Sequence, residues 1–242
     1  MNQPLVSVVI PSYNRFDFLI NAIKSVTNQT YPNVEIIVIN DGSTQKEYYE
    51  KDFDSSVKLI NLEKNQKSIH GYGPGNIRNF GIDNSEGKYI AFLDDDDYWF
   101  PNKLETQVAI LQENKLGISS SEALIGNGIY NNEMKYKRFL QDYYYKKIKK
   151  IYLPNYLTSL FRQFIFQDMW DEKFLRKHNC MITSSVIMEK SILDKINGFR
   201  NLPSNADWDC WRAAIQFSNS FFCKEPLLYY DNNHGSGREY KK

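Results

Sequence analysis

Four consecutive aspartates, Asp94 to Asp97, are the side chains whose type and spacing most clearly suggest chemistry in this chain of 242 residues. They directly follow residues 89–93, an apolar run with the pattern of a buried strand. Adjacent carboxylates raise one another's cost of ionisation, and a bound cation relieves that cost. Carboxylate oxygens are hard ligands that suit Mg²⁺ or Mn²⁺. We therefore expect a divalent-cation site at the end of this strand; the alternative is a solvated acidic loop.

Three further polar loops lie next to strand-like or helix-like runs, at residues 11–15, 40–43 and 71–75. Loops that follow successive strands of a parallel sheet converge on one edge, where such sheets bind ligands. Together with the aspartates, these loops would supply an aromatic face, an isolated carboxylate, an arginine and a bound cation. That combination suits a nucleoside diphosphate.

Three side chains in or after these loops each have a candidate role and a simpler alternative. Tyr13 could stack on a base, or it only packs at the end of a strand. Asp41 could accept a hydrogen bond from a base, or it only shapes its turn, since Asn, Asp and Gly favour such turns for backbone reasons. Arg78 could meet polar oxygens of the base or phosphate, or it pairs with a surface carboxylate. Only the ordered combination favours nucleotide binding.

The order of the elements predicts an α/β fold with a mainly parallel sheet. In the first hundred residues, short β-branched runs alternate with segments of helical periodicity, which implies right-handed crossovers. After residue 115 the pattern is less regular. The expected strands are 5–10, 34–39, 57–62, 88–93, 181–188 and 221–230, and the expected helices are 16–30, 74–84, 101–113 and 207–217.

The composition argues against several classes of protein. Thirty basic and 29 acidic side chains nearly cancel, so the net charge does not indicate a nucleic-acid partner. The three cysteines are too few and too far apart for a disulfide framework or a structural zinc site, and they fit a reducing cytoplasmic compartment. No segment approaches the ~20 apolar residues that span a bilayer, and no signal peptide is expected at the N-terminus.

Three segments in this order resemble the family 2 glycosyltransferases. They are V-S-V-V-I-P-S-Y-N-R at 6–15, I-I-V-I-N-D-G-S-T at 36–44, and the stretch from I-R-N-F-G to L-D-D-D-D-Y-W at 77–99. Residues 198–212, with G-F-R and A-D-W-D-C-W-R, resemble the second signature of that family. The resemblance covers most of the chain and is weak between about residues 115 and 180. The segments together are specific for this family, whereas no single motif among them would identify it.

The resemblance implies a GT-A fold, in which a Rossmann-like, mainly parallel central sheet is flanked by helices. Residues 1–115 would form a nucleotide-sugar-binding half and residues 116–242 a mixed acceptor-binding half of one continuous domain. It also implies inverting transfer of a sugar, hexosyl or N-acetylhexosaminyl, from a nucleotide diphosphate sugar to a hydroxyl. The commonest donors of the family make a UDP-sugar the best choice, with Mn²⁺ or Mg²⁺ as cofactor.

The resemblance also assigns roles to individual residues. Asp207 matches the carboxylate that acts as base, although Ala206 replaces the Glu that usually precedes it. That departure puts one supporting contact in doubt and leaves the base in place. The nucleotide-binding residues would be Pro11, Tyr13, Arg15, Asp41, Arg78, Asp94 and Asp95, with the last two at the ribose and the metal-bound water, and the metal-binding residues would be Asp96 and His234.

Residues 134–170 are rich in lysine and aromatic side chains, and we expect them to determine acceptor specificity. They also permit a peripheral contact with a membrane surface; the simpler alternative is a pair of amphipathic helices that covers the acceptor side. The acceptor would be a glycan, a lipid-linked saccharide or a protein, with no nucleic acid bound. The expected location is the cytoplasm, including the cytosolic face of a membrane.

Rival functions predict different features. A sugar nucleotidyltransferase would need a glycine-rich loop after the first strand, and residues 11–15 contain no glycine. A non-catalytic glycan- or membrane-binding module on the same fold would not need Asp207 or the aspartate run. A retaining transferase would differ in the anomeric configuration of its product.

Overall fold

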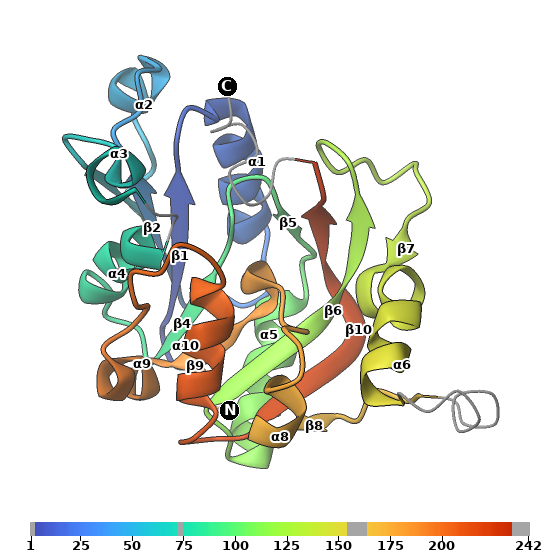
Figure 1. The fold of residues 1–242 in the computed structure, drawn as a ribbon. Helices are drawn as coiled ribbons and strands as arrows, with labels where there is room; N and C mark the ends of the chain where they lie inside the picture. Colours follow the sequence, from blue (N-terminus) through green and yellow to red (C-terminus); the bar gives the residue numbers. More distant parts are fainter. Residues whose placement is uncertain (1–2, 72–74, 154–163, 234–242) are drawn as a thin grey trace.

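A single ten-stranded sheet runs through the chain in the computed structural model, which describes residues 3–71, 75–153 and 164–233 (Figure 1). The strand order is β3-β2-β1-β4-β9-β6-β10-β5, with β7 beside β6 and β8 beside β10. Strands β1 to β4 pair in parallel, as the sequence predicts, whereas β9 joins β4 to β6 through antiparallel pairs. The predicted mixed α/β sheet is therefore confirmed. The division of roles at residue 115 stays a prediction.

The predicted elements of the first half are present close to their expected bounds. Each strand in this half is rich in β-branched residues, and the helix after the first strand buries one apolar face through Leu19, Ala22, Ile23 and Val26. The elements are β1 (Val6–Ser12), α1 (Phe16–Thr27), β2 (Val34–Asn40), α2 (Glu47–Glu50), β3 (Val57–Asn61), α3 (Gln66–His70), α4 (Gly75–Asp83), β4 (Tyr89–Phe92), β5 (Tyr98–Trp99) and α5 (Lys103–Asn114).

The second half departs more from the predictions. Within the strand expected at 181–188, residues 183–185 form a 3₁₀ turn, η2, and only residues 187 and 188 belong to β9. The expected helix 207–217 is α10, which ends at Ala214. The elements are β6 (Ile118–Gly126), β7 (Lys137–Arg138), η1 (Phe139–Tyr143, a π-helical turn), α6 (Tyr145–Tyr152), β8 (Met169–Trp170), α8 (Glu172–Leu175), η2 (Thr183–Ser185), β9 (Ile187–Glu189), α9 (Lys190–Ile196), α10 (Ala206–Ala214) and β10 (Ser220–Asp231).

Strand β6 was not predicted, because its sequence, I-S-S-S-E-A-L-I-G, has neither an alternating nor a continuous apolar pattern. Its serines and Glu122 are nevertheless buried. The Glu122 carboxylate accepts hydrogen bonds from the backbone N–H groups of Leu140 at 2.9 Å and Gln141 at 3.0 Å. This buried carboxylate therefore fixes η1, and α6 after it, against the central sheet.

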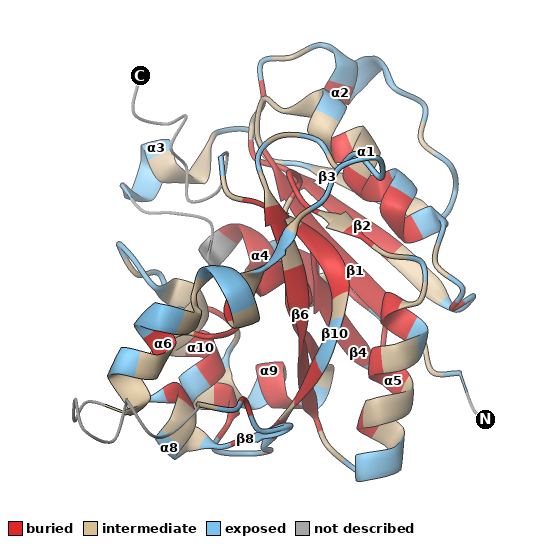
Figure 2. Ribbon diagram, turned by 90° about the vertical axis from the view of Figure 1, so that its right-hand side faces the viewer, coloured by how far each residue is buried: buried red, intermediate tan, exposed pale blue. Residues whose placement is uncertain are grey.

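Helices cover both faces of the sheet, and alternate side chains of each strand supply the two cores (Figure 2). On β1, Val9 faces α4, α9 and α10, whereas Val8 and Ile10 face α1 and α5. Burial on both faces explains why these strands read as nearly continuous apolar runs in the sequence.

Among the described residues, no helix is long and apolar enough to pass through a membrane.

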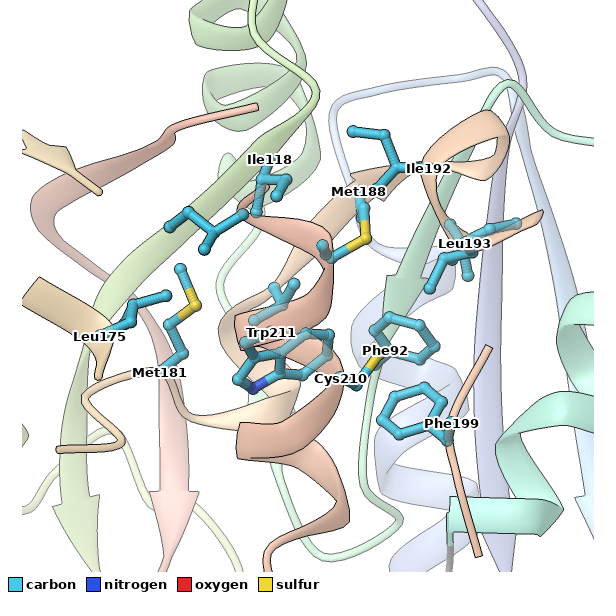
Figure 3. Packing of buried hydrophobic residues seen from close by; sticks show 14 of the residues in the cluster. Phe92, Ile118, Leu175, Met181, Met188, Ile192, Leu193, Phe199, Cys210 and Trp211 are labelled. Atoms are coloured by element: carbon cyan, nitrogen blue, oxygen red, sulfur yellow. The ribbon is translucent and has the colours of Figure 1, made fainter. Parts of the chain in front are cut away.

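Helix α10 is held on the sheet by aromatic packing, seen in Figure 3. The Trp211 ring lies 5.7 Å from the ring of Phe92 and 5.5 Å from that of Phe199, centre to centre. The rings of Phe92 and Phe199 meet edge to face at 5.2 Å. All three side chains are buried, and such pairs add about 0.5–1.5 kcal/mol beyond the burial of their area.

The loop after β2 depends on one glycine. Gly42 has φ +68°, and a Cβ at this position would lie 2.7 Å from the backbone nitrogen of Asn65. The absence of a side chain lets the loop approach the N-terminus of α3 closely, which brings Asp41 within reach of Asn65 and Gln66.

We predict that Gly42→Ala lowers the free energy of unfolding more than Gly128→Ala does. Both glycines have positive φ, so both substitutions carry the cost of a left-handed alanine, but a Cβ at Gly128 would meet nothing within 4 Å. The expected difference is about 1–3 kcal/mol, the usual cost of overpacking. Denaturant unfolding of the two variants measures it, and equal losses would contradict the close approach at Gly42.

Candidate active site

Three of the four predicted polar loops converge at the carboxyl ends of β1, β2 and β4, whereas residues 72–74 of the fourth lie outside the described residues. Ser12, the last residue of β1, donates a hydrogen bond to the Asp95 carboxylate at 2.7 Å. The backbone N–H of Asn14 donates to the Ser43 hydroxyl at 2.9 Å, and the Asn14 side chain accepts from the Thr44 N–H at 2.8 Å. These bonds join three loops that lie far apart in the sequence. Pro11 is buried within β1 itself.

Two arginines neutralise part of the aspartate run. The Arg15 guanidinium lies 3.2 Å from the Asp95 carboxylate and 3.0 Å from that of Asp96. Arg78 pairs with Asp94 and stacks over the Phe199 ring. The side chain of Asp94 is 31% exposed, whereas that of Asp96 is only 4% exposed. Of Asp94 and Asp96, Asp94 is therefore the carboxylate that faces solvent.

Burial makes ionisation of the run costly. It raises the pKa of Asp95 to about 6, although Arg15 and Ser12 oppose the rise. Burial, and after it the neighbouring carboxylates, raise the pKa of Asp96 and of Asp97 well above the usual range. Asp97 also has a structural role, since one of its oxygens accepts a hydrogen bond from the Asp231 N–H at 2.9 Å and so ties β10 to the acidic loop.

The donor set fits a hard divalent cation in part. Asp94 and Asp96 offer carboxylate oxygens, but no group of three acidic, histidine or cysteine side chains converges on one point among the described residues. Mg²⁺ often takes only one or two carboxylates and completes its shell with water and substrate phosphates. Such an ion would compete with Arg15 for Asp96. His234, the other predicted ligand, lies outside the described residues.

Asp41 is buried and already has two partners. Its carboxylate accepts from the Asn65 side chain at 2.7 Å and from the Gln66 N–H at 2.8 Å. Burial raises the pKa of Asp41 to about 6, while the Gln66 bond opposes the rise. These bonds tie Asp41 to the start of α3, whereas within the turn itself it is the Asn40 side chain that accepts from the Ser43 N–H, at 3.0 Å. Binding of a base would use the remaining lone pairs of the Asp41 carboxylate. Tyr13 lies half-buried in the loop after β1.

Asp207 lies in the first turn of α10, where the helix dipole favours a carboxylate. Its carboxylate accepts a hydrogen bond from the Asn179 side chain at 2.8 Å. The Asn179 side chain also accepts from the Met181 N–H at 3.2 Å, which fixes its amide. Asp207 is therefore oriented by a residue from a different segment of the chain. Its neighbour Asp209 is paired with Arg200 instead.

One cleft of about 510 Å³ brings the two carboxylate groups together. Asp94, at the end of the first half, and Asp207, in the second, both line it. A larger cleft of about 720 Å³ lies around Lys88 and Phe217, and none of the predicted site residues lines it. The full lining of the smaller cleft is Asp94, Phe139, Tyr144, Lys147, Lys177, His178, Asn179, Met181, Ile182, Thr183, Asn205, Asp207, Trp208 and Tyr230.

Comparison with known proteins decides the family. The model of the family described as "Glycosyl transferase family 2" matches residues 7–177. The chain belongs to this family. The transferase is 32% identical to an uncharacterized glycosyltransferase of Rickettsia typhi over 93% of its own length and 63% of the relative's. It is 30% identical to the UDP-Glc:alpha-D-GlcNAc-diphosphoundecaprenol beta-1,3-glucosyltransferase WfgD of Escherichia coli, over 59% of this chain and 57% of that protein. The transferase thus spans less than two thirds of either relative.

Two solved structures confirm the GT-A fold of the transferase. TarS 1-349 of S. aureus, in complex with UDP-GlcNAc, superposes with a TM-score of 0.68 at 19% identity, covering 98% of this chain and 61% of that one. The mannosyltransferase PcManGT of Pyrobaculum calidifontis, in complex with GDP-Man and Mn²⁺, gives a TM-score of 0.67 at 13% identity. The superposition covers 99% of this chain and 60% of that one. At such low identity the likeness concerns the fold alone.

Several residues of the candidate site were not predicted. Asn179 lies in an irregular segment and has no signal in a single sequence. Tyr230 lines the cleft at the end of β10, and burial, followed by the carboxylates of the acidic run, raises its pKa. It therefore keeps its proton and presents a hydroxyl donor near those carboxylates. Tyr230 could have been predicted from the sequence, because it is the last residue of the strand expected at 221–230.

We predict that Asp41 makes the unfolding free energy of the transferase fall as the pH rises from about 4 to about 6. Because the pKa of Asp41 in the folded chain is about 6, above its unfolded value, the native state holds a proton that the unfolded chain has released in this window. The decrease is at most roughly 3 kcal/mol.

Asp41→Asn should remove this part of the pH dependence, whereas Asp83→Asn, at an exposed position, should leave it unchanged. Denaturant unfolding at several pH values measures the slope. The same slope in the wild-type protein and in Asp41→Asn would contradict the prediction.

Proposed function

We propose that this glycosyltransferase moves a hexosyl or N-acetylhexosaminyl group from a UDP-sugar to an acceptor hydroxyl, with inversion and with a divalent cation. The observation that carries the proposal is the shared cleft, which Asp94 and Asp207 line from the two halves of the chain. One carboxylate serves the donor and the other serves the acceptor.

The donor nucleotide would lie across the ends of β1, β2 and β4. Tyr13 would stack on the base, Asp41 would accept its ring N–H, and Arg78 would contact its polar oxygens. UDP is favoured because the WfgD relative is named for UDP-Glc and the TarS structure contains UDP-GlcNAc. Asp94 and Asp95 would bind the ribose side of the nucleotide.

Asp96 would bind Mn²⁺ or Mg²⁺ directly, and His234 would be the second metal-binding residue, near the diphosphate. The cation would stabilise the negative charge that develops on the departing diphosphate. PcManGT, a neighbour in fold, was solved with Mn²⁺. Arg15, which pairs with Asp95 and Asp96, would give up one of these contacts as the cation binds.

Asp207 would act as the general base. It would take the proton from the acceptor hydroxyl as that oxygen attacks the anomeric carbon, while the bond between the sugar and the diphosphate oxygen breaks on the opposite face. Asn179 holds the Asp207 carboxylate in one orientation, and an oriented base contributes roughly 10²–10⁴-fold to such a step. The acceptor would be a glycan, a lipid-linked saccharide or a protein, and the reaction would take place in the cytoplasm.

Asp207→Asn should lower the rate of sugar transfer by roughly 10²–10⁴-fold, because the amide cannot accept the proton. The affinity for UDP should stay unchanged. The matched control is Asp209→Asn, two residues along the same helix, which removes only the pair with Arg200. A panel of UDP-sugars and acceptors, read as UDP release, measures the rates. Normal turnover by Asp207→Asn would exclude this residue as the base.

Asp96→Ala should abolish the enhancement of UDP binding by Mn²⁺, because it removes the carboxylate predicted to bind the cation directly. Calorimetric titration with UDP, with and without Mn²⁺, measures the effect. Asp17→Ala, at an exposed position of α1, is the control. An unchanged Mn²⁺ dependence in Asp96→Ala would place the cation elsewhere.

A further inference from the structure

The cleft that contains Asp94 and Asp207 also has a basic side. Lys147 of α6 and Lys177, which follows α8, both line it, together with His178. These residues come from the second half of the chain, whereas the residues predicted to bind the nucleotide come from the first. In Figure 1, α6 lies at the right of the molecule and α8 at the bottom, whereas α2 and α3 lie at the upper left.

The two ammonium groups are held in place by aromatic rings. Lys147 Nζ lies 4.9 Å from the centre of the Tyr144 ring, and Lys177 Nζ lies 5.0 Å from that of Tyr152. Tyr144 also packs against Phe139 of η1, which Glu122 fixes to the sheet. The lysines therefore belong to a supported wall of the cleft.

These positive charges are not neutralised by ion pairs among the residues that the structure describes. Within the described residues, no carboxylate forms an ion pair with Lys147 or Lys177, although Lys190, Lys224 and Lys88 each have one. Helix α6 contains four lysines and no acidic residue. Both lysines are exposed, so an anion in the cleft can reach them.

We propose that Lys147 and Lys177 bind a phosphate group of the acceptor, so that the transferase acts on a phosphate-bearing saccharide. This inference rests on the proposed function, because it takes Asp207 as the group that meets the acceptor hydroxyl. Both lysines line the cleft that Asp207 also lines, so the phosphate and the reacting hydroxyl would belong to one acceptor molecule bound there. Lysine binds phosphate as a point charge, whereas a planar carboxylate is better matched by arginine.

The test uses the full chain saturated with UDP and Mn²⁺, so that the donor site is blocked. The probes are N-acetylglucosamine 1-phosphate and N-acetylglucosamine, with binding followed by ligand-observed NMR. The phosphate should bind roughly 10-fold or more tightly than the neutral sugar. Lys147→Gln with Lys177→Gln should remove that preference and leave UDP affinity unchanged.

The matched control is Lys146→Gln with Lys150→Gln, which removes the same charge from exposed positions of α6 that do not line the cleft. It should keep the preference for phosphate. Equal binding of the two probes by the wild-type protein, or equal losses in the two double variants, would overturn the proposal. Weaker UDP binding by Lys147→Gln with Lys177→Gln would assign the lysines to the donor.

A further experiment distinguishes a sugar phosphate from a phospholipid as the molecule that carries the phosphate. Vesicles of phosphatidylglycerol and of phosphatidylcholine replace the sugar probes. If Lys147→Gln with Lys177→Gln loses only vesicle binding while the sugar phosphate never binds, the basic side is a membrane contact and the proposal fails. If UDP itself does not bind the wild-type protein, the proposed function fails first, which distinguishes the two failures.

Discussion

The packing of Trp211 against Phe92 is the interaction on which the site depends. Phe92 ends β4 two residues before Asp94, and Trp211 lies four residues after Asp207, on the same face of α10 and one helical turn away. The ring contact at 5.7 Å therefore fixes the two carboxylates relative to each other, although they belong to different halves of the chain. Neither half contains all the predicted site residues, since the last predicted donor loop, Asp94 to Asp97, lies in the first half and Asp207 lies beyond β9.

Electrostatics then determines what this site can bind. Four carboxylates in succession meet two arginines, and burial raises the pKa of Asp95, Asp96 and Asp97. The charge of the run is thus only partly neutralised within the described residues. A divalent cation would further lower the free-energy cost of ionising these carboxylates. The same cleft also carries charge of the other sign, through Lys147 and Lys177. A donor held through a cation and an acceptor held through an anion would meet in this cleft.

The sequence predicted the first half well because buried parallel strands give continuous apolar runs and end at polar loops. The convergence of Ser12, Asp41 and Asp95 followed from that pattern alone. Strand β6 was missed because its residues 119–122 are polar yet buried, and two of them, Ser119 and Glu122, pair with tertiary partners that no local pattern reveals. Asn179 and Lys177 were missed for the same reason, since their roles arise from contacts with α10 and α6. The family resemblance predicts Asp207 as the base, and this stays a prediction; its hydrogen bond with Asn179 required the structure.

The most direct measurement is calorimetric titration of the wild-type protein with UDP, dTDP and GDP, each with and without Mn²⁺. Tight binding of UDP that depends on Mn²⁺, with weaker binding of dTDP and GDP, is the predicted result. It would place a nucleotide diphosphate and a cation at the converging loops. Failure of all three nucleotides to bind a folded protein would contradict the catalytic function and favour a non-catalytic binding module on the same fold.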